Sequence, residues 1–145
     1  MARSADPLDG LDHDHASMSD ALDALVTAQR GGADLATLIE HAERLRDEFL
    51  DHFGDEEEHL FPELKKVVPE VTADLDELQL GHDTLCGLAV RIAVASETSP
   101  TQVDALIVRL DTAYRQHARR EIEVLRTALG KLPPDQRAEI LKRAH

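Results

Sequence analysis

The stretch "DHFGDEEEHLFPEL", residues 51–64, decides how this chain is expected to fold. Phe49 just before it, together with Leu60 and Leu64 within it, marks a helix with an apolar face. Three consecutive glutamates, residues 56–58, fall on the same helix. Because successive residues of an α-helix are about 100° apart, the three glutamates cannot all avoid the apolar face. One carboxylate is therefore expected to point into the core, where a buried charge needs a partner.

The overall composition indicates a helical protein. The 145 residues are 42% hydrophobic but only 3% aromatic, with no Trp, so Leu, Ala and Val must build the core. That mixture favours helices over strands. The formal charge of −13 at pH 7 argues against binding to nucleic acid or to an anionic membrane surface. We expect a single domain spanning residues 1–145.

Cysteine content and hydropathy favour a cytoplasmic protein. Cys86 is the only cysteine, so the chain cannot form an internal disulfide and nothing indicates an oxidising compartment. The N-terminal residues "MARSADPLDG" lack the apolar segment of a signal peptide, and no run approaches the roughly 18 apolar residues of a membrane span. We therefore expect a cytoplasmic location and no membrane partner.

Four segments with helical periodicity are separated by joints that contain glycine, proline or serine. The joints lie at residues 30–34, 68–74, 96–102 and 130–135. A short fifth segment follows at about residues 134–144. Amphipathic helices with short joints pack as antiparallel neighbours. The expected fold is all-α, an antiparallel up-down-up-down four-helix bundle over about residues 8–129 with a short C-terminal fifth helix.

Each of the four segments carries an apolar stripe that polar residues interrupt. The stripes are Leu8, Leu11, Met18, Leu22 and Leu25; Leu45, Phe49 and Leu60; Leu75, Leu78, Leu85, Ala89 and Ile92; and Val103, Leu106, Leu110, Val124 and Ala128. The interrupting residues that keep the helical spacing are His15, His52, Glu56, His82, His117 and Glu121. His13 falls off its stripe, and Glu57 and Glu58 are expected at the side of the helix or on the solvated surface.

Two helices carry the same unit, His-x-x-x-Glu, as "HFGDE" at residues 52–56 and "HARRE" at residues 117–121. At this spacing the two side chains lie on one helix face, about 6 Å apart along the axis, and can bind one metal ion or bridge two. A single histidine on an apolar face is more often a core residue than a ligand. Two unpaired core carboxylates, however, would cost on the order of several kcal/mol each, and bound cations would offset that cost.

The ligand types indicate which metal is expected. Imidazole and carboxylate without thiolate suit iron, manganese or zinc, whereas calcium and magnesium prefer more oxygen ligands. Four histidines and two glutamates match two ions, with Glu56 and Glu121 bridging; a solvent-derived bridge brings each ion to roughly five ligands and leaves an open position. A ferritin-like di-iron site requires Glu-x-x-His on two helices and a glutamate from each of two others. These helices offer one Glu-x-x-His match, Glu56 to His59, so a ferritin-like site is not expected.

The order of these residues resembles the hemerythrin-like (HHE cation-binding) family. The order is a histidine, His-x-x-x-Glu, a histidine and a second His-x-x-x-Glu, with "EEEHLFPEL" at residues 56–64, and the likeness covers about residues 11–129. It implies a hemerythrin-like domain with a non-haem di-iron centre bridged by an oxo or hydroxo group. The ligands that the resemblance implies are His15, His52, Glu56, His82, His117 and Glu121, with both glutamates bridging.

Two departures from the oxygen-carrying members of that family bear on function. The carriers have a further histidine one turn after the third-helix histidine, where this chain has Cys86. They also have an aspartate five residues after the last histidine, whereas this chain has Glu121 at four residues. Simple reversible oxygen carriage is therefore not the favoured function.

Three more residues are candidates to lie beside the metal site. Tyr114, one turn before His117, is interpreted as a hydrogen-bond donor, a ligand or, by preference, a packing residue. Cys86 is interpreted as redox-active or, by preference, as a small buried hydrophobe. His59 is expected to be partly buried and structural. The remaining histidines, His41 and His145, are expected to be exposed.

Three classes of function are compatible with such a site. The favoured one is binding of a small ligand (oxygen, nitric oxide or peroxide) at the iron pair, with a sensing or redox role. The second is an enzyme that decomposes peroxide or oxidises a substrate with oxygen, and the third is an iron-handling or structural protein. We expect no attached DNA-binding, signalling or substrate-binding domain. The sequence assigns no catalytic residue and no protein partner or redox donor.

Overall fold

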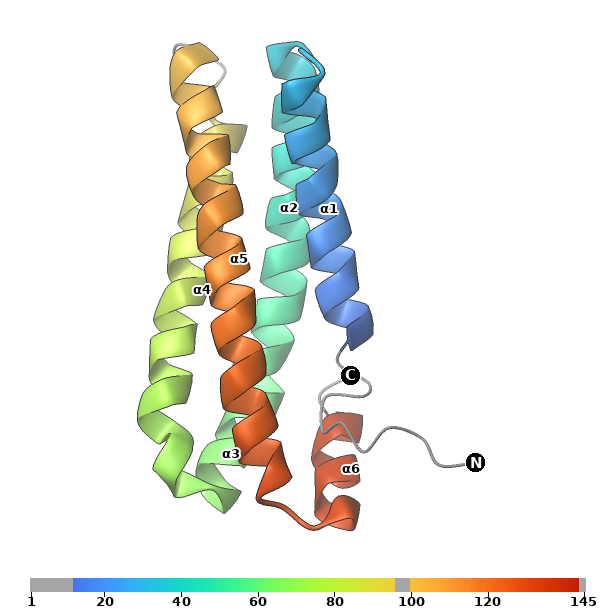
Figure 1. Ribbon diagram of the computed structural model, residues 1–145, viewed down its shortest axis with the longest axis vertical. Helices are drawn as coiled ribbons and strands as arrows, with labels where there is room; N and C mark the ends of the chain where they lie inside the picture. The colour runs from blue at the N-terminus through green and yellow to red at the C-terminus, as the bar shows by residue number, and fades with distance from the viewer. Residues whose placement is uncertain (1–11, 96–99, 144–145) are drawn as a thin grey trace.

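The computed structural model describes residues 12–95 and 100–143, and within these ranges it is helical and has no strand (Figure 1). The long helices are α1 (Asp12–Arg30), α2 (Leu35–Asp55), α4 (Thr72–Ala93) and α5 (Pro100–Gly130). The shorter ones are the π-helical η1 (Glu56–Leu60), α3 (Phe61–Val67), the 3-10 helix η2 (Pro69–Val71) and α6 (Pro134–Arg143). The prediction of an all-α protein is confirmed.

The long helices lie side by side and form a bundle (Figure 1). α1 contacts α2 and α5, and α4 contacts the same two helices, so the four enclose a common core. The turn between α1 and α2 lies at one end of the bundle, whereas α3 and η2 lie at the opposite end. α6 packs against η1 at that second end. None of the described helices is both long and apolar enough to cross a membrane.

Local sequence signals set the helix ends. Gly32, after α1, has a φ of +76°, a left-handed conformation that glycine adopts without steric cost. Asp34 caps α2 by accepting a hydrogen bond from the backbone N–H of Thr37 at 2.9 Å. Pro134 opens α6, where the missing N–H of proline leaves no helical hydrogen bond unmade.

The predicted joints agree with the structure to different degrees. Those at residues 30–34 and 130–135 contain the ends of α1 and α5. The joint at residues 68–74 is mostly helical, because residues 69–71 form η2 and α4 begins directly afterwards. Most of the joint at residues 96–102 lies outside the described residues. The predicted C-terminal helix corresponds to α6.

The apolar core consists of two clusters with a polar layer between them. On α4, Leu78 belongs to one cluster and Leu85 to the other, and His82 lies between them. On α5, Tyr114 and Val124 belong to different clusters in the same way. The buried polar residues of the layer are Glu56, His82 and Glu121. The polar layer therefore lies at the level where the predicted stripes are interrupted.

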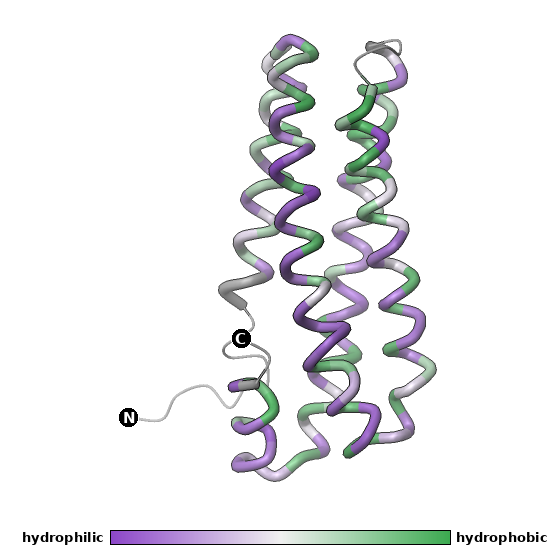
Figure 2. Tube along the Cα trace, turned by 180° about the vertical axis from the view of Figure 1, so that it is seen from behind, coloured by the Kyte–Doolittle hydropathy of each residue, from purple (hydrophilic) through white to green (hydrophobic). Residues whose placement is uncertain are grey.

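The predicted stripes are buried throughout the described residues, except that Leu106 is only half-buried. Figure 2 shows hydrophobic and hydrophilic residues alternating along the long helices, as expected when each helix has one face in the core. His41 is half-buried rather than exposed. Leu8, Leu11, His145 and the side chain of His13 lie outside what the structure describes.

Candidate metal centre

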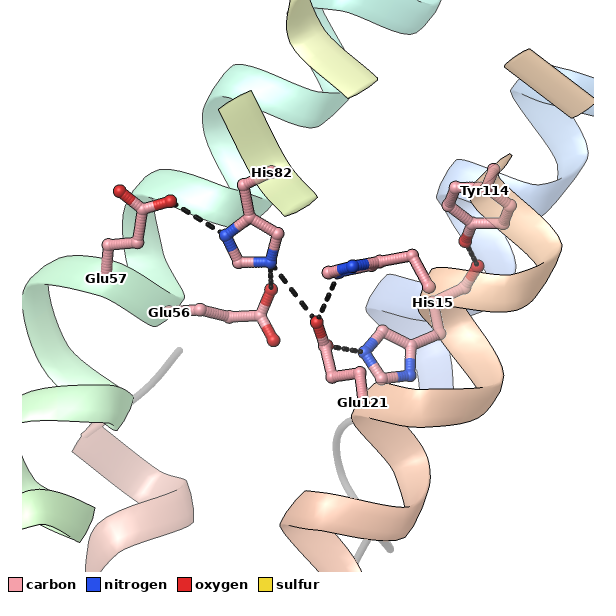
Figure 3. Close-up of polar contacts among 7 residues, drawn as sticks. His15, Glu56, Glu57, His82, Tyr114 and Glu121 are labelled. Atoms are coloured by element: carbon pink, nitrogen blue, oxygen red, sulfur yellow. Dashed lines mark hydrogen bonds and ion pairs between the residues drawn. The ribbon is translucent and has the colours of Figure 1, made fainter. Parts of the chain in front are cut away.

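Five of the six predicted ligands meet in the polar layer (Figure 3). In the described part of the chain, two groups of side chains place ligand atoms within 4.8 Å of one another. The first group is His82, His117 and Glu121, and the second is His15, Glu56 and Glu121. Glu121 belongs to both groups, so the two candidate cation positions share one carboxylate.

The carboxylate of Glu121 points its two oxygens at different imidazoles. Its Oε1 lies 2.9 Å from Nε2 of His15. Its Oε2 lies 3.0 Å from Nε2 of His117 and 3.2 Å from Nε2 of His82. A carboxylate that bridges two cations through separate oxygens presents them in this way, one toward each set of ligands.

The site has a negatively charged centre despite its burial. Burial raises the pKa of Glu121, but hydrogen bonds from Glu56, His117, His15 and His82 outweigh it and hold that pKa well below its usual range. Glu56 lies beside it, 6% exposed, with Oε1 3.6 Å from Nε2 of His82. Two buried carboxyl groups this close hold either a proton or a cation between them.

The π-helical segment η1 brings two adjacent glutamates to the same imidazole. The backbone N–H of Phe61 donates to the carbonyl of Glu56, five residues back, so this turn is wider than an α-helical turn. Glu57 Oε2 lies 2.7 Å from Nδ1 of His82. Glu57 lies at the side of the helix, 27% exposed, within the expected range, but its contact with His82 was not predicted from uniform α-helical geometry; Glu58 is exposed as expected.

Aromatic rings and a glycine fix the imidazoles. Phe53 stacks on the His82 ring with centroids 3.8 Å apart, and Phe61 stacks on the same ring at 5.7 Å. The Gly81 backbone lies so close to His117 that a Cβ at residue 81 would be 2.6 Å from its Nδ1. The spacing of residues in the sequence identifies neither Phe53 nor Gly81 as a site residue. For Gly81 the one signal in the sequence is that a residue without a side chain directly precedes His82.

His52 is the sixth predicted ligand, and it belongs to neither of the two groups. Its Nε2 lies 2.9 Å from Oε2 of Glu48, one turn earlier on α2, and that oxygen also accepts a hydrogen bond from Ser17 Oγ at 2.9 Å. His52 is half-buried and one turn before Glu56. Its role as a ligand stays a prediction.

Tyr114 contacts the backbone of a candidate ligand. Its hydroxyl donates to the carbonyl of His15 at 3.5 Å and lies 3.3 Å from Ser19 Oγ. Its ring stacks on Phe49 with centroids 5.8 Å apart. Burial is the main reason that the pKa of Tyr114 is raised. This neutral phenol ties α5 to α1 at the edge of the polar layer.

Cys86 and His59, the other two residues predicted to lie beside the metal site, differ in burial. Cys86 is half-buried and packs against the apolar cluster that contains Leu85. Burial, followed by the charges of Asp83 and Glu57, raises the pKa of Cys86 to about 11. A thiol with this pKa is neutral at physiological pH and a poor nucleophile. His59 is 52% exposed, so the expectation of partial burial is wrong; the wider turn of η1 changes the direction of the side chains that follow Glu56.

Each of the two groups offers donors that could hold a cation. One group offers two imidazole nitrogens and a carboxylate, and the other offers one imidazole and two carboxylates, with no thiolate in either group. This combination suits iron, manganese or zinc. Bound cations would balance the negative charge of the two buried glutamates.

One comparison with known proteins agrees with this donor set. The family described as the hemerythrin HHE cation binding domain matches residues 6–129. The match covers most of the 145 residues and all six predicted ligands. Neither the curated proteins nor the solved structures include a significant match.

Proposed function

The chain belongs to the hemerythrin HHE cation binding domain family, and from this premise we propose that its polar layer binds two iron ions. At this iron pair the protein binds oxygen, nitric oxide or peroxide in a sensing or redox role. The proposed domain spans residues 1–145 as an up-down-up-down four-helix bundle with α6 as its fifth helix. The observation that carries the proposal is the position of Glu121, whose two oxygens face separate imidazoles.

The proposed ligands are His15, His52, Glu56, His82, His117 and Glu121, with both glutamates bridging. In this role His52 turns from Glu48 toward the layer. A bound iron pair supplies redox-active centres with an open position for a small ligand. The apolar clusters above and below exclude water, and the stacked rings of Phe53 and Phe61 hold His82. Cys86 supplies no further imidazole, which leaves more room for an added ligand.

Metal content tests the iron pair directly. Protein produced with ample iron is expected to contain two irons per chain, and Glu121→Gln is expected to lose most of both because this carboxylate serves both groups. Glu58→Gln is the matched control, since Glu58 is an acid near the layer that is 78% exposed. One zinc and no iron in the wild type would contradict the di-iron proposal. Equal loss from both variants would contradict the role of Glu121.

Optical spectra separate the ligand-binding role from its alternatives. The anaerobically reduced protein is mixed in turn with oxygen, nitric oxide and peroxide, and a stoichiometric spectral change with at least one of them is expected. Continuous consumption of peroxide would instead show that the protein is an enzyme that decomposes peroxide. An iron-loaded protein that responds to none of the three would be an iron-handling protein.

A further inference from the structure

Two glutamates that are neighbours in the sequence contact opposite sides of one imidazole ring (Figure 3). Glu57 Oε2 lies 2.7 Å from Nδ1 of His82, and Glu56 Oε1 lies 3.6 Å from Nε2 of the same ring. Glu121 Oε2 approaches that Nε2 at 3.2 Å. Both glutamates come from η1, where the wider π-helical turn carries adjacent side chains to the same neighbour.

The contact with Glu57 determines where His82 carries its proton. A neutral imidazole has one N–H donor and one lone pair, and an ionised carboxylate can only accept. A contact of 2.7 Å with a carboxylate therefore requires the hydrogen on Nδ1. Nε2 is then the nitrogen that remains for a cation, on the side of the ring that faces Glu56 and Glu121.

Packing keeps the ring in this orientation. The His82 side chain is 2% exposed, and Phe53 and Phe61 stack on it with interplanar angles of 7° and 21°. Exchanging the two ring nitrogens would require a flip against these aromatic rings. By contrast, Nδ1 of His117 lies against the backbone of Gly81. The carboxylate of Glu57 therefore distinguishes the surroundings of His82 Nδ1 from those of His117 Nδ1.

We propose that Glu57 is a positioning residue that holds His82 with its hydrogen on Nδ1, so that Nε2 is the nitrogen left to bind a metal. The consequence for metal binding rests on the proposed function: an imidazole that donates to a carboxylate is a stronger and better oriented ligand. Loss of such a partner typically lowers metal affinity about 10–100-fold. Glu57 would therefore tune the site without touching the metal.

The test reads the His82 proton by ¹H–¹⁵N correlation across the ring, in metal-free protein and in protein loaded with diamagnetic Zn²⁺. In the wild type, Nδ1 is expected to carry the hydrogen in both states, and Zn²⁺ is expected on Nε2. Glu57→Leu should remove the preference for Nδ1–H, and Glu57→Gln should restore it because the amide oxygen still accepts. Glu58→Leu, on the exposed neighbour, is the matched control.

Affinity for Zn²⁺, measured by competition with a chelator, is expected to fall about 10–100-fold in Glu57→Leu and to stay unchanged in Glu58→Leu. Circular dichroism confirms that each variant is folded. A wild-type His82 without hydrogen on Nδ1, or a Glu57→Leu ring identical to the wild type, would overturn the inference. A wild type that binds no metal but keeps the Nδ1 hydrogen would refute the proposed function and leave the role of Glu57 intact.

Discussion

Replacing Gly81 with alanine is expected to damage the metal centre through a single methyl group. The new Cβ would lie 2.6 Å from Nδ1 and 3.1 Å from Cε1 of His117, whereas ordinary contact begins at 3.4 Å. The imidazole would have to move by about 0.8 Å, the difference between 3.4 and 2.6 Å. It cannot retreat freely, because its Nε2 is 3.0 Å from Glu121 and its ring packs edge-on to His82.

The expected loss of affinity follows from that displacement. Metal ligands must be held within about 0.5 Å of their productive positions, so a shift of this size should weaken metal binding at least about tenfold. The effect on the free energy of unfolding has two opposing parts. Overpacking costs about 1–3 kcal/mol, but alanine in place of glycine inside a helix stabilises it by about 0.5–1 kcal/mol.

Gly87→Ala is the matched control on the same helix. Gly87 is exposed, and a Cβ there would meet nothing within 4 Å. This variant should gain about 0.5–1 kcal/mol of stability and bind metal normally. Chelator competition gives the affinities and thermal denaturation of the metal-free proteins gives the stabilities. If Gly81→Ala binds iron as tightly as the wild type and Gly87→Ala do, the close approach of Gly81 to His117 does not position the ligand.

Three further predictions follow from burial and charge. Phe49→Ala should lower the free energy of unfolding by about 3–5 kcal/mol, because Phe49 is fully buried. Leu50→Ala, at a 58% exposed position, should change it by no more than about 0.5 kcal/mol. Equal losses of stability in urea titrations would contradict the orientation of this helix. Removing the metal should lower the melting temperature, since a ligand at 100 times its Kd stabilises the fold by about 2.7 kcal/mol; identical melting curves would indicate a site outside the core. Alkylation of Cys86 should be slow near neutral pH and accelerate as the pH approaches about 11, because burial first, then Asp83 and Glu57, raise the pKa of its thiol; a rate that levels off near the pKa of an ordinary thiol would contradict this.

Helical spacing was enough to predict which faces are buried and where the polar layer lies. Met18, Leu22 and Leu25 on α1 are all in the core, as their spacing of three and four indicates. The same spacing placed Glu56 and Glu121 inside, and both are buried. These features depend only on the direction of a side chain from a regular helix, which the sequence periodicity encodes.

Features that depend on irregular backbone or on three-dimensional contact were not predictable in this way. The π-helical turn of η1 has no distinctive composition, so the contact between Glu57 and His82 was not predicted. The role of Gly81 depends on a residue 36 positions later on another helix. Spacing also places His52 beside Glu56 but does not determine its partner, which in this structure is Glu48.

The polar layer also has a consequence for how the protein unfolds. It separates two apolar clusters that share no residue, so the halves of the bundle are joined through the helix backbones and through the layer itself. Without metal, each half is expected to open as its own cooperative unit, and amide hydrogen exchange would then differ between the two ends of one helix. Cations bound to ligands from α1, η1, α4 and α5 would make the two halves exchange as one. The metal centre would then set the size of the cooperative folding unit as well as the chemistry of the site.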